Sequence, residues 1–405
     1  IMTGQTNGNV NFQSAVRTFH VLGFQSNLSY RFETGSLKHH LQSGFRFHSD
    51  DADRYATQST YLMSNSTMIL SAAGVKGNAE NQLRKAKSFA SYVQYDLQLD
   101  KWTLTPGIRY EAMELGYDNY GNSDIARLGT ALKTATNSID IFLPGVGISY
   151  ALKENERVFG GIHRGFSPPG MPSLNSNLTQ AKSETAISYE LGYRKHTKNF
   201  KTQVVAFLNE YQNILGSDNV SGGGAGTGDM FNAGNAKIQG VEFSAEQNLW
   251  PSSTKWRLPL NIAYTFNEAK FMQTFVNAGG DWGTGTITKG ELMPFITPHL
   301  WSLSVGLESD KLNVTVVSRY VGNTRVKTGN SVDILPSASA KYNDINTIGG
   351  YWVVDLSANY AFSKYTTLFS TVNNMLNNSY VVANLPQGFR PGMPFSVNIG
   401  VKINL

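Results

Sequence analysis

Apolar and polar residues alternate along most of the chain with a period of two. Between Leu37 and His48, the odd positions carry mainly apolar side chains and the even positions mainly polar ones. The same alternation recurs in Phe89–Leu99, Trp102–Tyr110 and Phe142–Tyr150. Because successive side chains of a β-strand point to opposite faces of a sheet, this pattern predicts strands with one apolar and one polar face.

Short turns and long polar or glycine-rich segments alternate between these strands. Short turns are predicted at Thr34–Ser36, Asp100–Lys101, Lys153–Glu156, Thr197–Asn199, Pro251–Thr254, Ser309–Lys311 and Ser363–Lys364. Long loops are predicted at His48–Arg84, Leu115–Asn137, Pro168–Lys182, Leu215–Asn232, Glu268–Pro294, Gly322–Gly349 and Leu376–Pro391. Short turns at one rim and long loops at the other are typical of bacterial outer-membrane β-barrels.

The turns predict about fifteen strands, from a first strand at Arg17–Phe32 to a last strand at Phe395–Leu405. Most are long enough to cross a bilayer at a tilt, which takes roughly 9–11 residues. Because bacterial single-chain barrels normally have an even number of strands, we expect at least one strand to be missing before the first. The predicted fold class is all-β, an antiparallel transmembrane β-barrel. Residues 1–405 are interpreted as the C-terminal part of a single larger barrel domain.

Composition agrees with this fold and excludes several others. Charged residues make up 16% and aromatic residues 12% of the 405 residues, a mixture too apolar for a disordered chain. No run approaches eighteen consecutive apolar residues, so no transmembrane helix is predicted, and no signal peptide is visible. The absence of cysteine excludes disulfides and cysteine-based metal centres. The net charge of +5 is not gathered into a basic stripe, so no nucleic-acid partner is predicted.

Six segments, spread in order from Gly165 to Pro394, resemble motifs of the TonB-dependent receptor family. The segments that resemble its barrel strands are Ser188–Arg194 (SYELGYR), Phe207–Ile214 (FLNEYQNI), Asn232–Glu242 and Asn373–Tyr380. Gly165–Pro169 (GFSPP) and Gly388–Pro394 (GFRPGMP) resemble motifs of the ferric-dicitrate (FecA-like) branch of that family. The last strand departs from the family pattern, because it ends in Leu405 rather than in an aromatic residue.

The resemblance implies a barrel of about twenty-two strands whose lumen is filled by a plug domain. The plug and about seven strands are then expected outside this chain. The implied protein is a receptor of the bacterial outer membrane, not an enzyme, and it needs no resident cofactor. It is expected to import a ferric chelate, either ferric citrate or a siderophore. The implied partners are outer-membrane lipid and, through the plug, the TonB–ExbB–ExbD complex.

Binding an anionic chelate calls for guanidinium groups, which hold carboxylates in a bidentate manner. The candidate ligand-binding residues are Arg46, Arg109 and Gln94 on polar strand faces, His48 near a loop mouth, and Arg319, Arg325 and Arg390 near loop ends. For each arginine the alternative is structural, namely an ion pair with a carboxylate of the plug or of a neighbouring strand. Arg164 follows the apolar parity of its strand and is expected to face lipid headgroups.

No metal site is predicted. The seven histidines are scattered, and the adjacent His39 and His40 must point to opposite faces of a strand. Asp50, Asp51 and Asp53 open the first predicted long loop, where Ca²⁺ binding is the alternative to a solvated acidic loop.

Three other functions stay open at the level of sequence. A receptor of the same kind could import another metal complex, haem, cobalamin or a glycan. A passive porin or an adhesin would use the same barrel without a plug. A soluble β-sandwich or propeller would show similar alternation but would stay in solution without detergent.

Overall fold

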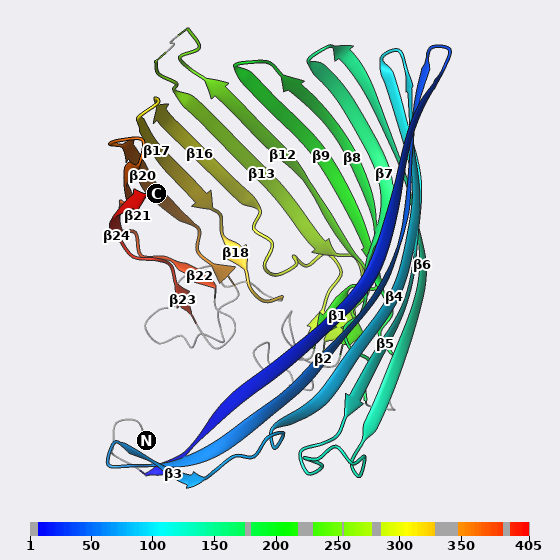
Figure 1. The fold of residues 1–405 in the computed structure, drawn as a ribbon, viewed down its shortest axis with the longest axis vertical. Coiled ribbons are helices and arrows are strands. Elements are labelled where there is room, and N and C mark those ends of the chain that lie inside the picture. The colour runs from blue at the N-terminus through cyan, green and yellow to red at the C-terminus, as the bar shows by residue number, and fades with distance from the viewer. Residues whose placement is uncertain are drawn as a thin grey trace.

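In the computed structural model the chain is built of β-strands (Figure 1). The structure describes residues 7–174, 180–217, 230–252, 255–277, 285–328, 347–383 and 389–404. One large antiparallel sheet has the strand order β1-β2-β4-β5-β6-β7-β8-β9-β12-β13-β16-β17-β20-β21-β24, with β3 (Thr67–Ala72) paired to β2 beside this path. The prediction of an all-β antiparallel sheet of about fifteen strands is confirmed.

The strands of this path are β1 (Gly8–Thr34), β2 (Leu37–Ser64), β4 (Glu80–Leu99), β5 (Trp102–Asn119), β6 (Lys133–Lys153), β7 (Glu156–Ser167), β8 (Glu184–His196), β9 (Phe200–Gln212), β12 (Ala236–Asn248), β13 (Pro259–Phe271), β16 (His299–Glu308), β17 (Leu312–Val321), β20 (Tyr351–Ala361), β21 (Thr366–Asn373) and β24 (Ser396–Ile403). Each of the seven predicted short turns falls between consecutive strands of the path, and residues 253–254 of the predicted Pro251–Thr254 turn lie outside the described residues. Gly35 and Asp100 stand in two of them with φ of +60° and +50°. Glycine adopts this left-handed region freely and aspartate tolerates it better than most residues, so both turns can be tight.

An apolar band covers one face of the sheet. Val93 of β4, Ile108 of β5 and Pro144 of β6 are direct neighbours across three strands, and the Ile108 side chain is 49% exposed. In β2 the band runs from Leu37 to Phe47, which corresponds to about 25 Å for a strand tilted near 40°. This height matches the apolar band of outer-membrane barrels. We call this side the apolar face and the opposite side, which carries Gln94, the polar face.

The first five strands of the path continue well beyond the apolar band, and this corrects the sequence prediction. The band ends at the row Phe24–Phe47–Phe89, and the next row on the same face contains Ser49 and Lys87. The expected loop His48–Arg84 is mostly strand, because β2 ends at Ser64 and β4 begins at Glu80. The expected loop Leu115–Asn137 is likewise shortened at both ends, and β1 is longer than Arg17–Phe32. Where water meets both faces, no apolar alternation marks a strand. We call these protruding parts of β1, β2, β4, β5 and β6 the extension.

Four of the other long loops begin and end in short hairpins. These are β10 (Leu215–Ser217) with β11 (Met230–Asn232), β14 (Phe275–Asn277) with β15 (Gly285–Ile287), β18 (Thr324–Arg325) with β19 (Thr347–Ile348), and β22 (Val381–Ala383) with β23 (Arg390–Pro391). Ile214, Ala236, Phe271 and Ile287 form a buried hydrophobic cluster at the first two hairpins. The middles of five predicted loops, and Leu405 of the predicted last strand, lie outside the described residues.

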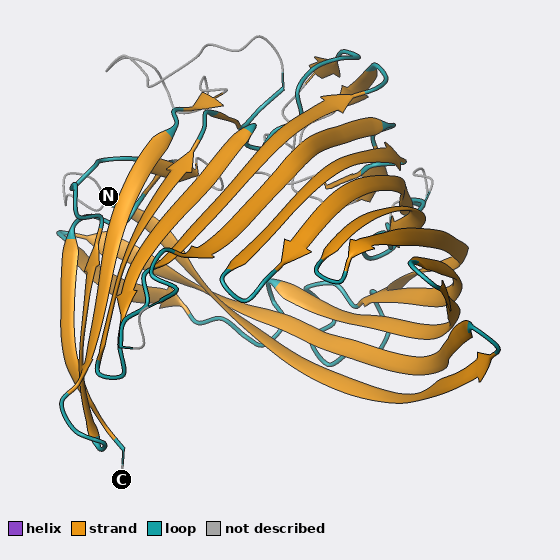
Figure 2. Ribbon diagram, turned by 90° about the horizontal axis from the view of Figure 1, so that it is seen from above, coloured by secondary structure: helices purple, strands orange, loops and turns teal. Residues whose placement is uncertain are grey.

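The sheet curves through a wide arc, and its first and last strands do not pair (Figure 2). In the described residues, β24 has β21 as its one neighbour in the sheet. The described strands therefore form an open arc rather than a closed ring. The described part of the chain contains no helix long and apolar enough to cross a membrane.

Candidate functional site

Four of the seven predicted ligand-binding residues share one wall of the sheet, on the polar face of β2, β4 and β5. Arg46 lies in the same row as Ala90 and Glu111. Ala90, whose side chain is a single methyl group, therefore stands between Arg46 and Glu111. Arg46 Nη2 lies 2.9 Å from His48 Nδ1, and His48 Nε2 lies 3.5 Å from a carboxylate oxygen of Asp50. These contacts leave the guanidinium of Arg46 without a carboxylate partner within the described residues.

Arg109 is held by a carboxylate of its own strand. Its Nε donates to Glu111 Oε1 at 2.6 Å, and its Nη2 pairs with the same oxygen. Glu111 is buried at 6% exposure, whereas the Arg109 side chain is 44% exposed. Arg109 therefore forms a structural ion pair, but with a carboxylate of its own strand rather than of the plug or of a neighbouring strand, and its side chain stays partly exposed.

A shallow pocket of about 530 Å³ lies beside Arg109 on this wall. Gln94, His163 and Glu190 contribute polar side chains to its lining, and Gly107 and Gly147 belong to its floor. A Cβ atom added at Gly147 would come no closer than 3.8 Å to Thr105, so packing within the sheet does not require glycine there. The glycines instead leave the wall flat. Gln94 also donates to Asp96 at 3.4 Å.

The other three predicted residues do not join this wall. Arg319 of β17 forms an ion pair with Asp355 of β20, on the opposite side of the curved sheet from β2 (Figure 1). Arg325 lies in the β18–β19 hairpin and lines a separate pocket of about 320 Å³. Arg390 is exposed in β23 and pairs with Ala383 of β22. The structure thus brings together Arg46, His48, Gln94 and Arg109, and the ligand-binding role of all seven residues stays a prediction.

The apolar parity predicted for Arg164 agrees with the register. Arg164 pairs with Ile187 of β8, and its Nη1 donates to the carbonyl oxygen of Phe142 at 3.3 Å. His39 and His40 also point to opposite faces, as predicted. His39 contacts Thr34 and Tyr95, whereas His40 lies 3.2 Å from Asp96.

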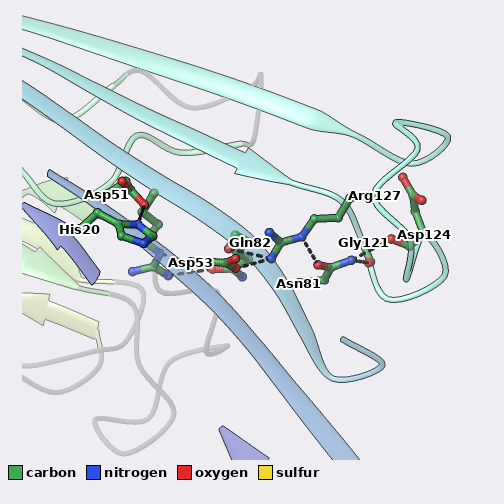
Figure 3. Close-up of polar contacts among 9 residues, drawn as sticks. His20, Asp51, Asp53, Asn81, Gln82, Gly121, Asp124 and Arg127 are labelled. Carbon is green, nitrogen blue, oxygen red and sulfur yellow. Dashed lines mark hydrogen bonds and ion pairs between the residues drawn. The ribbon is translucent and has the colours of Figure 1, made fainter. Parts of the chain in front are cut away.

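The three aspartates after His48 belong to strand β2 rather than to a loop, and each has a separate partner. Asp51 lies 3.0 Å from His20, and Asp53 accepts from Arg127 at 2.6 Å (Figure 3). With Asp50 directed to His48, the three carboxylates do not converge on one point. Among the described residues, no group of three or more histidine, aspartate or glutamate side chains is arranged to hold a metal ion.

Arg127 fastens the turn between β5 and β6 to the extension (Figure 3). Its Nε donates to Asn81 Oδ1 at 2.7 Å, and the amide of Asn81 donates to the Asp124 carbonyl at 2.8 Å. The Asp124 carboxylate accepts from the backbone amides of Leu128 and Gly129, both at 2.8 Å. Burial opposes the charge of Asp124, but these and the neighbouring backbone amides outweigh it and lower the pKa of the carboxyl group.

Sequence reasoning missed a group of arginines on the polar face of the extension, namely Arg17, Arg54 and Arg84. Arg17 and Arg54 are direct partners in the β1–β2 register, and Arg84 lies on β4 two residues from the partner of Arg54. The period-two parity of β2 could have placed Arg54 on the same face as Arg46, since the two positions differ by an even number. Because the residues after His48 were predicted to form a loop, this parity was not applied to Arg54.

Comparison with known proteins gives a consistent result. The family described as "TonB dependent receptor-like, beta-barrel" matches residues 2–375. The catecholate siderophore receptor Fiu of Escherichia coli K12 is 23% identical over 406 aligned positions, covering 92% of this chain and 50% of Fiu. The unliganded ferric citrate transporter FecA superposes with a TM-score of 0.71 at 18% identity, covering 97% of this chain and 55% of that one. The siderophore receptor PiuA from Acinetobacter baumannii gives 0.73 at 17% identity, with coverages of 96% and 56%. The chain spans about half the length of the relatives it matches.

Proposed function

This chain belongs to the TonB-dependent receptor β-barrel family, and from that premise we propose that the protein containing it imports a ferric chelate across a bacterial outer membrane. The observation that carries the proposal is the family match over residues 2–375, on a sheet with one apolar and one polar face. Once such a sheet is closed into a barrel, it can cross the bilayer, because every backbone group then pairs with a neighbouring strand while lipid meets the apolar side.

The proposed cargo is an anionic chelate. Two similar proteins are named for such cargo, a catecholate siderophore receptor and a ferric citrate transporter. The polar wall supports the same class, because Arg46 and the outer edge of Arg109 offer guanidinium donors beside the Gln94 pocket. Guanidinium groups bind carboxylate and catecholate oxygens with two parallel hydrogen bonds. Ferric citrate, which the resemblance to the FecA-like branch favours, is one member of this class.

Import of this kind involves no covalent step. The chelate would bind at the long-loop side, and TonB with ExbB and ExbD would drive its passage by acting on a plug outside this chain. The role of residues 1–405 is then to form the barrel wall and part of the ligand-binding surface. The protein is accordingly proposed to be a transporter and not an enzyme.

Uptake of radioactive iron tests the proposal. Cells that carry the full-length receptor should accumulate ⁵⁵Fe supplied as ferric dicitrate or as a ferric catecholate, and the same cells without TonB should not. Uptake that persists unchanged without TonB would rule out energised import and favour a passive channel. Uptake restricted to haem, cobalamin or a glycan would keep the receptor class but replace the cargo.

A further inference from the structure

Four glycines stand side by side on the polar face of β5, β6 and β7. Gly107 is the direct partner of Gly145, and Gly147 is the direct partner of Gly161. Gly145 and Gly147 are two positions apart on β6, so the two pairs occupy adjacent rows of the same face. We call Gly107, Gly145, Gly147 and Gly161 the glycine patch.

The backbone does not require glycine at these positions. None of the four has φ in the left-handed region. An added Cβ atom would lie 3.3 Å from its nearest neighbour at Gly107 and 3.8 Å at Gly147, and 3.1 and 3.2 Å at Gly145 and Gly161, where a small shift would be needed. Glycine weakens a strand, because it loses more conformational entropy on folding and offers no side chain to the neighbouring strand. Two adjacent glycine pairs are therefore unfavourable for the sheet itself.

Other glycines of the polar face are covered, whereas the glycine patch is bare. At four of them an aromatic ring of the partner strand occupies the space that a side chain would take. These pairs are Gly44–Tyr92, Gly192–Phe159, Gly240–Phe207 and Gly400–Phe369, where an added Cβ atom would lie 2.3 to 2.7 Å from a ring atom. Among the described residues, no ring atom is one of the nearest neighbours of the glycine patch. The space above the patch is thus left open to another molecule.

The glycine patch is the floor of the pocket of about 530 Å³ described above. Polar side chains stand around this floor, with Gln94 on the β4 side and His163 and Glu190 on the β7–β8 side. His163 and Glu190 make no hydrogen bond or ion pair with the other described residues. The floor itself consists of backbone that is paired within the sheet. A molecule on the patch would therefore meet polar groups at its edges and few groups that could hold it from below.

The position of the glycine patch suits passage rather than tight binding. Arg109 lies two residues from Gly107 on the same face of β5, on the side of the long loops. Gly107 is next to Ile108, so the patch lies within the height of the apolar band, which imported cargo has to cross. Passage requires contacts that are weak enough to release the cargo again. A wall without side chains meets that requirement better than a wall of long side chains.

We propose that the glycine patch is the part of the lumen wall along which the ferric chelate passes after it leaves Arg109, and that its lack of side chains sets the size of chelate that the receptor imports. The inference rests on the proposed function and adds a route and a size limit for its cargo. The bare surface spans three strands, which corresponds to roughly 10 Å across the wall. The four glycines thus determine specificity through the room that they leave.

Side chains of increasing volume at Gly147 test the passage in cells that carry the full-length receptor. This position has the most room of the four, so the fold should tolerate the change. The variants are Gly147→Ala, Gly147→Leu and Gly147→Trp, and the probes are ⁵⁵Fe supplied as ferric dicitrate and as the ferric complex of 2,3-dihydroxybenzoate. We expect the initial uptake rate to fall stepwise with side-chain volume, about tenfold for tryptophan. The equilibrium Kd for the receptor in outer-membrane vesicles should stay within about twofold, because the arginines that bind the chelate are unchanged.

The matched control is Ala263→Trp, at an exposed position on the polar face of β13 between Ser244 and Ser302. It should leave the uptake rate unchanged, and heat-dependent electrophoretic mobility confirms that each variant is folded. The leucine variant serves if Gly147→Trp does not fold.

Uptake at the wild-type rate in Gly147→Trp would overturn the passage while leaving the proposed function intact. Equal losses in the two tryptophan variants would also overturn it, because the effect would then not depend on the glycine patch. Sensitivity of Gly147→Trp cells to a large antibiotic such as vancomycin would overturn it as well, since the added side chain would then have displaced the plug. A wild-type receptor that takes up no ferric chelate at all would overturn the proposed function itself.

Discussion

Replacing Ile108 by arginine should destabilise the folded receptor far more than replacing Gln94 by arginine. The two residues are close together at mid-height of the band, since Gln94 is the direct partner of Gly107 and Ile108 is the partner of Val93. They differ in the face that they occupy. Ile108 is 49% exposed on the apolar face.

The size of the effect follows from this position. A guanidinium at the midplane of the lipid-facing surface of a barrel costs about 2–4 kcal/mol. This corresponds to a shift of about 30- to 900-fold in the folding equilibrium. At Gln94 the same group stays on the polar wall, away from lipid, so the shift there should stay within about twofold, as for surface substitutions of around 0.5 kcal/mol or less.

Urea titration of the full-length receptor refolded into phospholipid vesicles measures both values. The folded fraction is read from tryptophan fluorescence and from the change of electrophoretic mobility on heating. The Ile108→Arg variant should unfold at a lower urea concentration with an unchanged slope. Equal losses of stability in the two variants would show that the faces are not divided between lipid and water, and the assignment of the wall would fail with it.

Three further predictions concern the polar wall and the extension. Arg46→Ala and Arg109→Ala should each weaken ferric-citrate binding about tenfold by loss of a charged hydrogen bond, and unchanged equilibrium affinity in both variants would contradict their proposed role. Arg127→Ala removes the bonds to Asp53 and Asn81 and should raise hydrogen exchange in residues 120–132 about tenfold, a modest value because the ion pair is partly exposed. Backbone amides lower the pKa of Asp124. The stability that its carboxylate gives to the turn is therefore fully present above the ordinary carboxyl pKa of about 3.9, and it is lost as the pH falls through the lower pKa of the folded state. Exchange protection of the same turn, measured relative to Asp124→Asn, should therefore hold at neutral pH and vanish in acid, and a constant ratio across this range would refute the reasoning.

Alternation of residue types was sufficient to predict the strands wherever lipid meets one face. Leu37–Phe47 and Trp102–Tyr110 could be recognised as strands because an apolar side chain at every second position has a physical cause there. The short turns could be located for a related reason, since residues such as Gly35 and Asp100 tolerate the left-handed backbone that a tight turn needs. Fold class and face assignment were therefore accessible from sequence.

The extension was not accessible, because water reaches both of its faces and removes the pattern. A polar residue such as Arg54 and an aromatic residue such as Tyr55 can each stand on either face there. A strand of that composition lacks apolar alternation and is predicted to be a loop. Backbone pairing holds it in place instead, with an unbroken register from Gly8 opposite Met63 to Thr34 opposite Leu37. Backbone hydrogen bonds do not involve the side chains, so they do not constrain which residue types occur in the sequence.

The same reasoning explains why the group of three arginines on the polar face of the extension could not be found from the sequence. Arg17, Arg54 and Arg84 are separated by 37 and 30 positions, which match no ligand-binding motif. They meet only because β1 and β2 are joined by a two-residue turn and β2 pairs with β4 in a fixed register. A shift of that register by one residue would send Arg84 to the other face, among Asp51, Asp53 and Asp118, where carboxylates are plentiful. The grouping of the three arginines is thus a property of the strand alignment, and it depends on the turn at Gly35 as much as on the arginines themselves.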